Sequence, residues 1–175
     1  MKVKSKLKST ARKVARAMTP QGHGNGERDI LDTLKQEHEE VKGLLADLEQ
    51  AQSGAQRRSL VEKIKLALVP HTKAEQKVLY DAVIKLRDKD AQQDGYEGYL
   101  EHEWASKTLQ RLDSMPDATS PEHKATAKVL KELVEHHIEE EESNVWGDAE
   151  KNFSSEQRVR MNAAYESAKS RVRVP

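Results

Sequence analysis

Two short strings of sequence, His71-Thr72-Lys73-Ala74-Glu75 and His137-Ile138-Glu139-Glu140-Glu141, decide how this 175-residue chain folds. Each string places a glutamate four residues after a histidine. On a helix, that spacing stacks the imidazole and the carboxylate on one face, within reach of a common ion. The strings therefore predict two helices that carry paired polar donors on the faces they turn towards their neighbours.

A further histidine precedes each string at a similar distance. His38 precedes His71 by 33 residues, and His102 precedes His137 by 35. Both leading histidines stand in a Glu-His-Glu triplet. The chain thus consists of two similar halves, and this repeat predicts two helical hairpins that face each other.

Apolar residues at alternating spacings of three and four predict the helices themselves. In the first helix Leu34 and Val41 flank His38 on this inner stripe. Pro70 interrupts the second helix, where it is expected to bend the chain just before His71. The expected helices cover about residues 28–50, 56–87, 95–115 and 120–148, and a last one begins near 154.

These patterns predict an all-α protein, an antiparallel up-down four-helix bundle over residues 28–150. Residues 151–175 are expected to form an extra C-terminal helix outside the bundle. Residues 1–18 contain seven basic residues and no acid, and their apolar residues follow one stripe, which predicts a basic amphipathic helix. Residues 19–27 combine Pro20 with three glycines and are expected to be a flexible hinge.

The composition excludes several kinds of site and of location. The chain has no cysteine, so any metal must be held by nitrogen and oxygen donors. Thirty basic residues balance thirty acidic ones, which excludes a strong overall field. No stretch has the length of apolar sequence that a membrane span or a secretory signal requires, so a cytoplasmic protein is expected.

Six polar side chains occupy inner positions of the four central helices. A single histidine on an apolar stripe is more often a hydrogen-bonded core residue than a ligand. Burying two carboxylates among four imidazoles, however, costs several kcal/mol per charge, against a net stability of roughly 5 to 15 kcal/mol for a domain. A divalent cation removes this conflict, so the sequence predicts a metal site. Its donors would be His38, His71, Glu75, His102, His137 and Glu141.

The order His, His-x3-Glu, His, His-x3-Glu over residues 28–150 resembles the hemerythrin HHE cation-binding family. That resemblance implies a four-helix bundle around two iron ions, bridged by carboxylates and by an oxo or hydroxo oxygen. It implies the same six residues as ligands, with Glu75 and Glu141 as the bridging pair. Manganese and zinc remain alternatives to iron.

The chain departs from the oxygen-carrying hemerythrins at Ser106, where those proteins have a second histidine in the third helix. Four nitrogens, two bridging carboxylates and one bridging oxygen leave two of the twelve positions of two octahedral metals open. That arrangement favours chemistry with peroxide, dioxygen or nitric oxide over reversible oxygen carriage, unless Tyr99 fills one position.

Two other histidines and an acidic run have alternative interpretations. His136 is expected to face away from the stripe, at the surface or behind the ligands, although it could replace His137 as the ligand. His123 is expected to be solvated. In residues 139–142, Glu141 is expected to point inward while the others form a solvated face that attracts cations.

The leading functional hypothesis is a diiron protein that binds or senses dioxygen, nitric oxide or iron. An enzyme that decomposes peroxide or oxidises ferrous iron is the first alternative, with the same metals as its centre. The second alternative is a metal-stabilised interaction protein that contacts an anionic membrane or nucleic acid through residues 1–18.

Overall fold

A computed structural model describes residues 27–175, and every regular element within them is a helix. The predicted all-α class is therefore confirmed. The expected basic segment, residues 1–18, lies outside the described residues, as does all of the expected hinge except residue 27.

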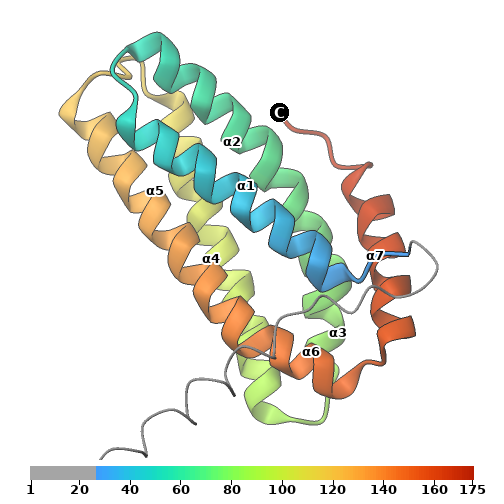
Figure 1. Cartoon of the computed structure of the whole chain (residues 1–175). Coiled ribbons are helices and arrows are strands. Elements are labelled where there is room, and N and C mark those ends of the chain that lie inside the picture. Colours follow the sequence, from blue (N-terminus) through green and yellow to red (C-terminus); the bar gives the residue numbers. More distant parts are fainter. Residues whose placement is uncertain (1–26) are drawn as a thin grey trace, which may run out of the picture.

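Four long helices lie side by side and enclose the core, as Figure 1 shows. Short connections reverse the chain between them, and each packs against two of the others: α1 against α2 and α5, and α4 against the same two. The four helices are α1 (Ile30–Gln50), α2 (Gly54–Glu75), α4 (Lys89–Ser114) and α5 (Pro121–Glu140).

Side-chain caps decide where these helices begin. The side chains of Asp29, Ser53, Asp88 and Ser120 each accept a hydrogen bond from a backbone N–H in the first turn of the helix that follows. Such caps satisfy amides that have no partner inside the helix. The expected starts of three helices agree with the structure to within about two residues, whereas α4 begins six residues before the expected residue 95.

The predicted start of α4 at residue 95 is wrong, because Gly95 lies inside the helix and not at its beginning. A Cβ atom at Gly95 would come within 2.8 Å of the Ile84 side chain, and one at Gly98 within 2.6 Å of the Tyr80 ring. Both glycines thus permit close packing and do not mark a helix end. Asp88, which was not considered as a cap, sets the true beginning.

Both helices that carry the histidine–glutamate strings widen into a π-helical turn next to the glutamate. Helix α2 continues as η1 (Gln76–Tyr80) and α3 (Asp81–Val83), and α5 continues as η2 (Glu141–Val145) and α6 (Trp146–Asn152). The second expected helix therefore ends at 83, not 87, and Pro70 lies inside α2 without ending it. Single π turns of this kind occur frequently at functional sites.

The core consists of two apolar clusters with a polar layer between them. One cluster includes Val41, Leu68 and Val134, and the other includes Leu34, Ala74 and Val145. Along the chain, Leu68 and Val134 of the first cluster precede the two histidine–glutamate strings, and Leu79 and Val145 of the second cluster follow them. The polar layer is where the predicted site lies.

The last helix, α7 (Ser155–Lys169), packs against α1, α2 and η1. Arg158 Nε donates to Asp29 Oδ2 at 2.8 Å, so the beginning of α7 is tied to the cap of α1. Tyr165, further along α7, is fully buried. The C-terminal helix is thus a docked part of the structure (Figure 1).

The prediction that His123 is solvated was wrong, because its side chain is only 1% exposed. It lies in the first turn of α5, close to the buried Arg57. Burial, and then the charge of Arg57, lower the pKa of His123. The apolar stripe of α5 does not indicate that His123 lies near the first turn of α2, so the sequence alone could not predict its burial.

Candidate metal centre

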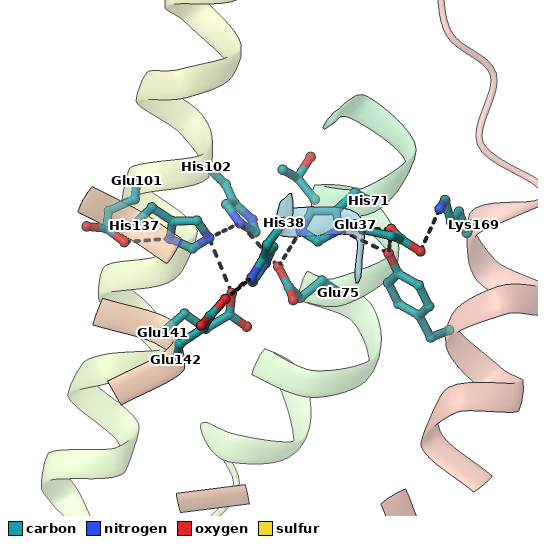
Figure 2. A network of polar contacts seen from close by, with 12 residues as sticks. Glu37, His38, His71, Glu75, Glu101, His102, His137, Glu141, Glu142 and Lys169 are labelled. Carbon is teal, nitrogen blue, oxygen red and sulfur yellow. Dashed lines mark hydrogen bonds and ion pairs between the residues drawn. The ribbon is translucent and has the colours of Figure 1, made fainter. Parts of the chain in front are cut away.

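All six predicted donor side chains meet in the polar layer, and each of the six residues is at least 94% buried. They come from all four long helices and from η2, which begins at Glu141. Figure 2 shows the four imidazoles arranged around the two carboxylates.

Each carboxylate lies against two imidazoles from different helices. Glu75 Oε2 is 3.4 Å from His71 Nε2 and 3.4 Å from His102 Nε2. Glu141 Oε2 is 3.4 Å from His38 Nε2 and 3.6 Å from His137 Nε2. All four histidines therefore present the same ring nitrogen, Nε2, to the centre.

The donor atoms form two groups that share one residue. His38, His71 and Glu75 form one group, and Glu75, His102 and His137 form the other, with the donor atoms of each group within 4.8 Å of one another. Each group is compact enough to hold one metal ion. Glu75 belongs to both, and Glu141 contacts one histidine of each group.

The protein alone leaves the two central carboxylates unsatisfied. Neither oxygen of Glu75 or of Glu141 has a hydrogen-bond partner, although all four are buried. Burial, and then the nearby Glu141, raise the pKa of Glu75 well above its usual value. Burial also raises the pKa of Glu141, but His38, His137 and Glu75 together outweigh burial and lower it. Buried carboxylate oxygens without donors are what a bound cation would satisfy.

A second set of carboxylates orients three of the four histidines. Glu142 lies 3.0 Å from His38 Nδ1, Glu37 lies 3.0 Å from His71 Nδ1, and Glu101 lies 2.7 Å from His137 Nδ1. A carboxylate only accepts, so in each pair Nδ1–H donates, and in the neutral ring Nε2 keeps its lone pair facing the centre. This is the arrangement that fixes metal-binding histidines in proteins.

The fourth histidine, His102, has no such partner. Its Nδ1 is buried and makes no hydrogen bond, while its Nε2 lies 2.9 Å from His137 Nε2. Burial, and then the neighbouring His137, lower the pKa of His102 well below its usual value, so the ring is neutral.

Residues of α7 hold one of the outer carboxylates. The Tyr165 hydroxyl donates to Glu37 Oε2 at 2.6 Å, and Lys169 Nζ lies 2.8 Å from Glu37 Oε1 (Figure 2). Burial raises the pKa of Glu37, but its bonds to His71, Lys169 and Tyr165 outweigh burial and bring the pKa to about 2. Glu37 is therefore charged and accepts from three donors at once.

Two residues that were considered as ligands lie elsewhere. The Tyr99 hydroxyl lies 2.8 Å from Asp81 Oδ1, to which it donates, and 3.2 Å from the Gln76 carbonyl. The His136 side chain is 61% exposed, as expected for a surface residue. His136 belongs to neither donor group, and the Tyr99 hydroxyl is bound to Asp81.

The outer carboxylates and Tyr165 were not assigned roles in the sequence. The Glu-His-Glu triplets contained a signal for two of them, because Glu37 and Glu101 come from those triplets. Each bonds the second histidine of its own half, not the histidine that follows it in the chain. Glu142, in the acidic run, is only 27% exposed and contacts His38 rather than forming a purely solvated face.

The chain is thus a helical bundle whose buried histidines and carboxylates could hold metal ions. A family model described as the hemerythrin HHE cation binding domain matches residues 29–147, and the chain belongs to that family.

The chain is also similar to a protein named DNA nickase from Nostoc sp. (strain PCC 7120 / SAG 25.82 / UTEX 2576). The two are 27% identical over 152 residues, which cover 87% of this chain and 42% of the relative. The chain thus spans less than half the length of that relative. No solved structure matches it significantly, and no helix among residues 27–175 is long and apolar enough to cross a membrane.

Proposed function

We propose that this protein is a non-haem diiron protein that binds or senses dioxygen, nitric oxide or iron. The observation that carries the proposal is the way each central glutamate joins histidines of both donor groups. With two ions bound, His38 and His71 would serve one ion and His102 and His137 the other. Glu75 and Glu141 would bridge them.

The residues present fit this cofactor. Imidazoles and carboxylates, with no thiolate, suit iron, and manganese and zinc are the alternatives. The four orphaned oxygens of Glu75 and Glu141 would gain the cations that they lack in the protein alone. When bound, an iron pair supplies redox and Lewis-acid chemistry towards small oxygen- and nitrogen-containing molecules.

The chain's own residues prepare the site for this chemistry. Glu142, Glu37 and Glu101 hold three imidazoles in the tautomer that exposes the Nε2 lone pair. Burial in the bundle excludes bulk water from the donors and limits access to small ligands. Rigid helices on all sides keep the donors in place without metal, which lowers the cost of ordering them.

Anaerobic reconstitution with ferrous iron tests the proposal, followed by metal counting and an absorption spectrum in air. Two irons per chain and charge-transfer bands are expected. Glu75→Gln should lower the iron count, because the amide is a weaker donor than the bridging carboxylate. His136→Ala, which removes an exposed imidazole one residue from a ligand, should leave it at two. A wild-type count below two rejects the diiron site.

A peroxide-decomposing or ferroxidase enzyme is a second candidate at the same centre. It is favoured by Ser106, because no fifth histidine fills the space beside His102 and a cavity reaches that residue. If iron-loaded protein consumes peroxide over many turnovers and His102→Ala abolishes the reaction, this function holds. Stoichiometric bleaching that stops after one equivalent supports binding or sensing instead.

A nucleic-acid contact is a third candidate. It is favoured by the seven basic residues in 1–18 and by the similarity to a protein named DNA nickase. Electrostatic binding to phosphates would weaken steeply with salt. Deleting residues 1–18 should abolish binding to a DNA duplex, and loading zinc in place of iron should leave it unchanged. Binding that survives the deletion refutes a role for this segment.

A further inference from the structure

A cavity of about 170 Å³ lies between α2 and α4, directly behind His102. Its walls include apolar side chains of both helices. Its polar lining consists of Thr72, Lys73, Gln76, Ser106 and Glu103. The charged ends of Lys73 and Glu103 lie at an exposed rim, so the cavity joins the solvent to a buried ligand candidate. A void of this size holds several water molecules or one small solute.

The two halves of the chain place equivalent residues around the site, but one pair of equivalent positions differs. Glu142, the residue after Glu141, accepts from His38 of the opposite hairpin. By the same relation, the residue after Glu75 should accept from His102. That residue is Gln76, and it makes no hydrogen bond with His102 Nδ1.

With a metal on Nε2 of His102, the missing partner would leave Nδ1–H of the same ring as a donor without an acceptor. Nε2 of His102 faces Glu75, so Nδ1 lies on the opposite side of a ring that is 97% buried and that lines the cavity. A buried N–H without an acceptor destabilises the folded protein. An acceptor of the right size in the cavity would remove that destabilisation.

We propose that this cavity binds a small oxyanion, such as formate, acetate or bicarbonate, in place of the missing fourth carboxylate. The anion accepts from His102 Nδ1–H at the buried end. The Gln76 amide, the Ser106 hydroxyl and the Lys73 ammonium offer it further donors. The site rests on the proposed metal centre in one respect, since a metal on Nε2 fixes the proton on Nδ1.

The charges around the cavity favour an anion. Lys73 is the only basic residue of the lining, and its exposed ammonium is not among the described ion pairs, all of which involve other cations. Glu103, the one carboxylate of the lining, is paired with Lys107 along α4. The neutral Gln76, unlike a glutamate at the same position, does not repel a bound anion.

Calorimetric titration of formate into the metal-loaded protein tests the proposal, with ionic strength held constant. Saturable binding of one formate per chain is expected. Gln76→Glu should abolish it, because the new carboxylate supplies the missing acceptor and repels a second one. Lys73→Met should weaken it about threefold, since a rim charge is partly screened. Lys77 is also exposed, lies one helical turn after Lys73 and does not line the cavity. Lys77→Met should therefore leave formate binding unchanged.

The same variants separate this site from formate bound directly to metal. Direct binding would survive Gln76→Glu, and that result overturns the proposal. In zinc-loaded protein, formate should also shift the nitrogen resonance of His102 Nδ1 and leave that of His38 Nδ1 unchanged. Absence of saturable formate binding in protein that has taken up metal equally overturns it. Metal counts on the same samples show separately whether the metal centre itself has failed.

Discussion

The Tyr165 hydroxyl lies outside the donor set, but we expect its removal to lower metal affinity. It is buried, donates to Glu37 and lies 3.1 Å from His71 Nδ1. Tyr165→Phe removes the donor and keeps the ring. Loss of partners behind metal-ligating histidines lowers metal affinity by about 10- to 100-fold, and the same range is expected here. Titration with a competing chelator measures the affinity.

The matched control is Tyr99→Phe, which also removes one tyrosine hydroxyl near the centre. That hydroxyl bonds Asp81 and the Gln76 carbonyl, and neither is a proposed ligand. Metal affinity should therefore stay within about twofold of wild type, a change in binding free energy smaller than RT. Equal losses of affinity in both variants would show that Tyr165 acts through general stability and not through Glu37.

Gly98 makes a second prediction at the level of one residue. A methyl group there would meet two ring atoms and the hydroxyl oxygen of Tyr80 at 2.6 to 2.8 Å, and Tyr80 is fully buried beside His102. Gly98→Ala should lower the free energy of unfolding by about 1 to 3 kcal/mol, as overpacking does. Gly43→Ala, with nothing within 4 Å, should raise it by roughly 0.5 to 1 kcal/mol through helix propensity. Urea denaturation measures both, and a stabilising Gly98→Ala would contradict the packing.

At the level of elements, the sequence predicts the helices well where an apolar stripe and a cap coincide. Helix α1 is an example, with Leu34 and Val41 around His38 and an aspartate cap before it. The stripe did not indicate the π turns, because one added residue per turn leaves no compositional mark. The predicted start of α4, the helix that Asp88 caps, is six residues too late, because a glycine inside a helix resembles a helix boundary in sequence.

The same distinction applies to the site. Its six donors could be predicted because four histidines and two glutamates interrupt apolar stripes at fixed spacings. The outer partners could not be assigned, because each connects residues of different helices, as Tyr165 and Glu37 do across 128 positions. Such contacts depend on how helices dock, and the apolar spacing within one helix carries no information about that.

The contact between α7 and the beginning of α1 can be tested by mutation. Arg158 pairs with Asp29, whose other oxygen caps α1, and both side chains are more than 85% buried. Arg158→Leu would leave that carboxylate without its cation, at a cost of roughly 1 to 3 kcal/mol in unfolding free energy. Arg111→Leu breaks an exposed pair with Glu122 and should cost less than about 0.5 kcal/mol. Thermal unfolding distinguishes the two variants, and equal losses would refute the anchor.

For the whole molecule, the polar layer divides the apolar core into two parts. It separates the core into the cluster around Leu45 and Leu130 and the cluster around Leu34 and Tyr165. Between them, six donors converge on a small volume in which two carboxylates lack partners. Metal bound there would stabilise the folded state by mass action and would join the clusters. Without metal, we expect this layer to be the least stable part of the core, because its two carboxylates lack partners.

Metal removal should therefore loosen one end of the molecule more than the other. The cluster with Tyr165 is held by α7 and the short elements after the π turns, whereas the other lies between long, continuous helices. Chelation should lower the melting temperature and speed amide hydrogen exchange in α3, α6 and α7. Exchange in residues 41–48 and 127–134 should change far less, because their packing does not depend on the donors. Exchange that rises equally throughout would mean that the bundle unfolds as one unit, and the metal would then stabilise the whole core rather than the joint between its halves.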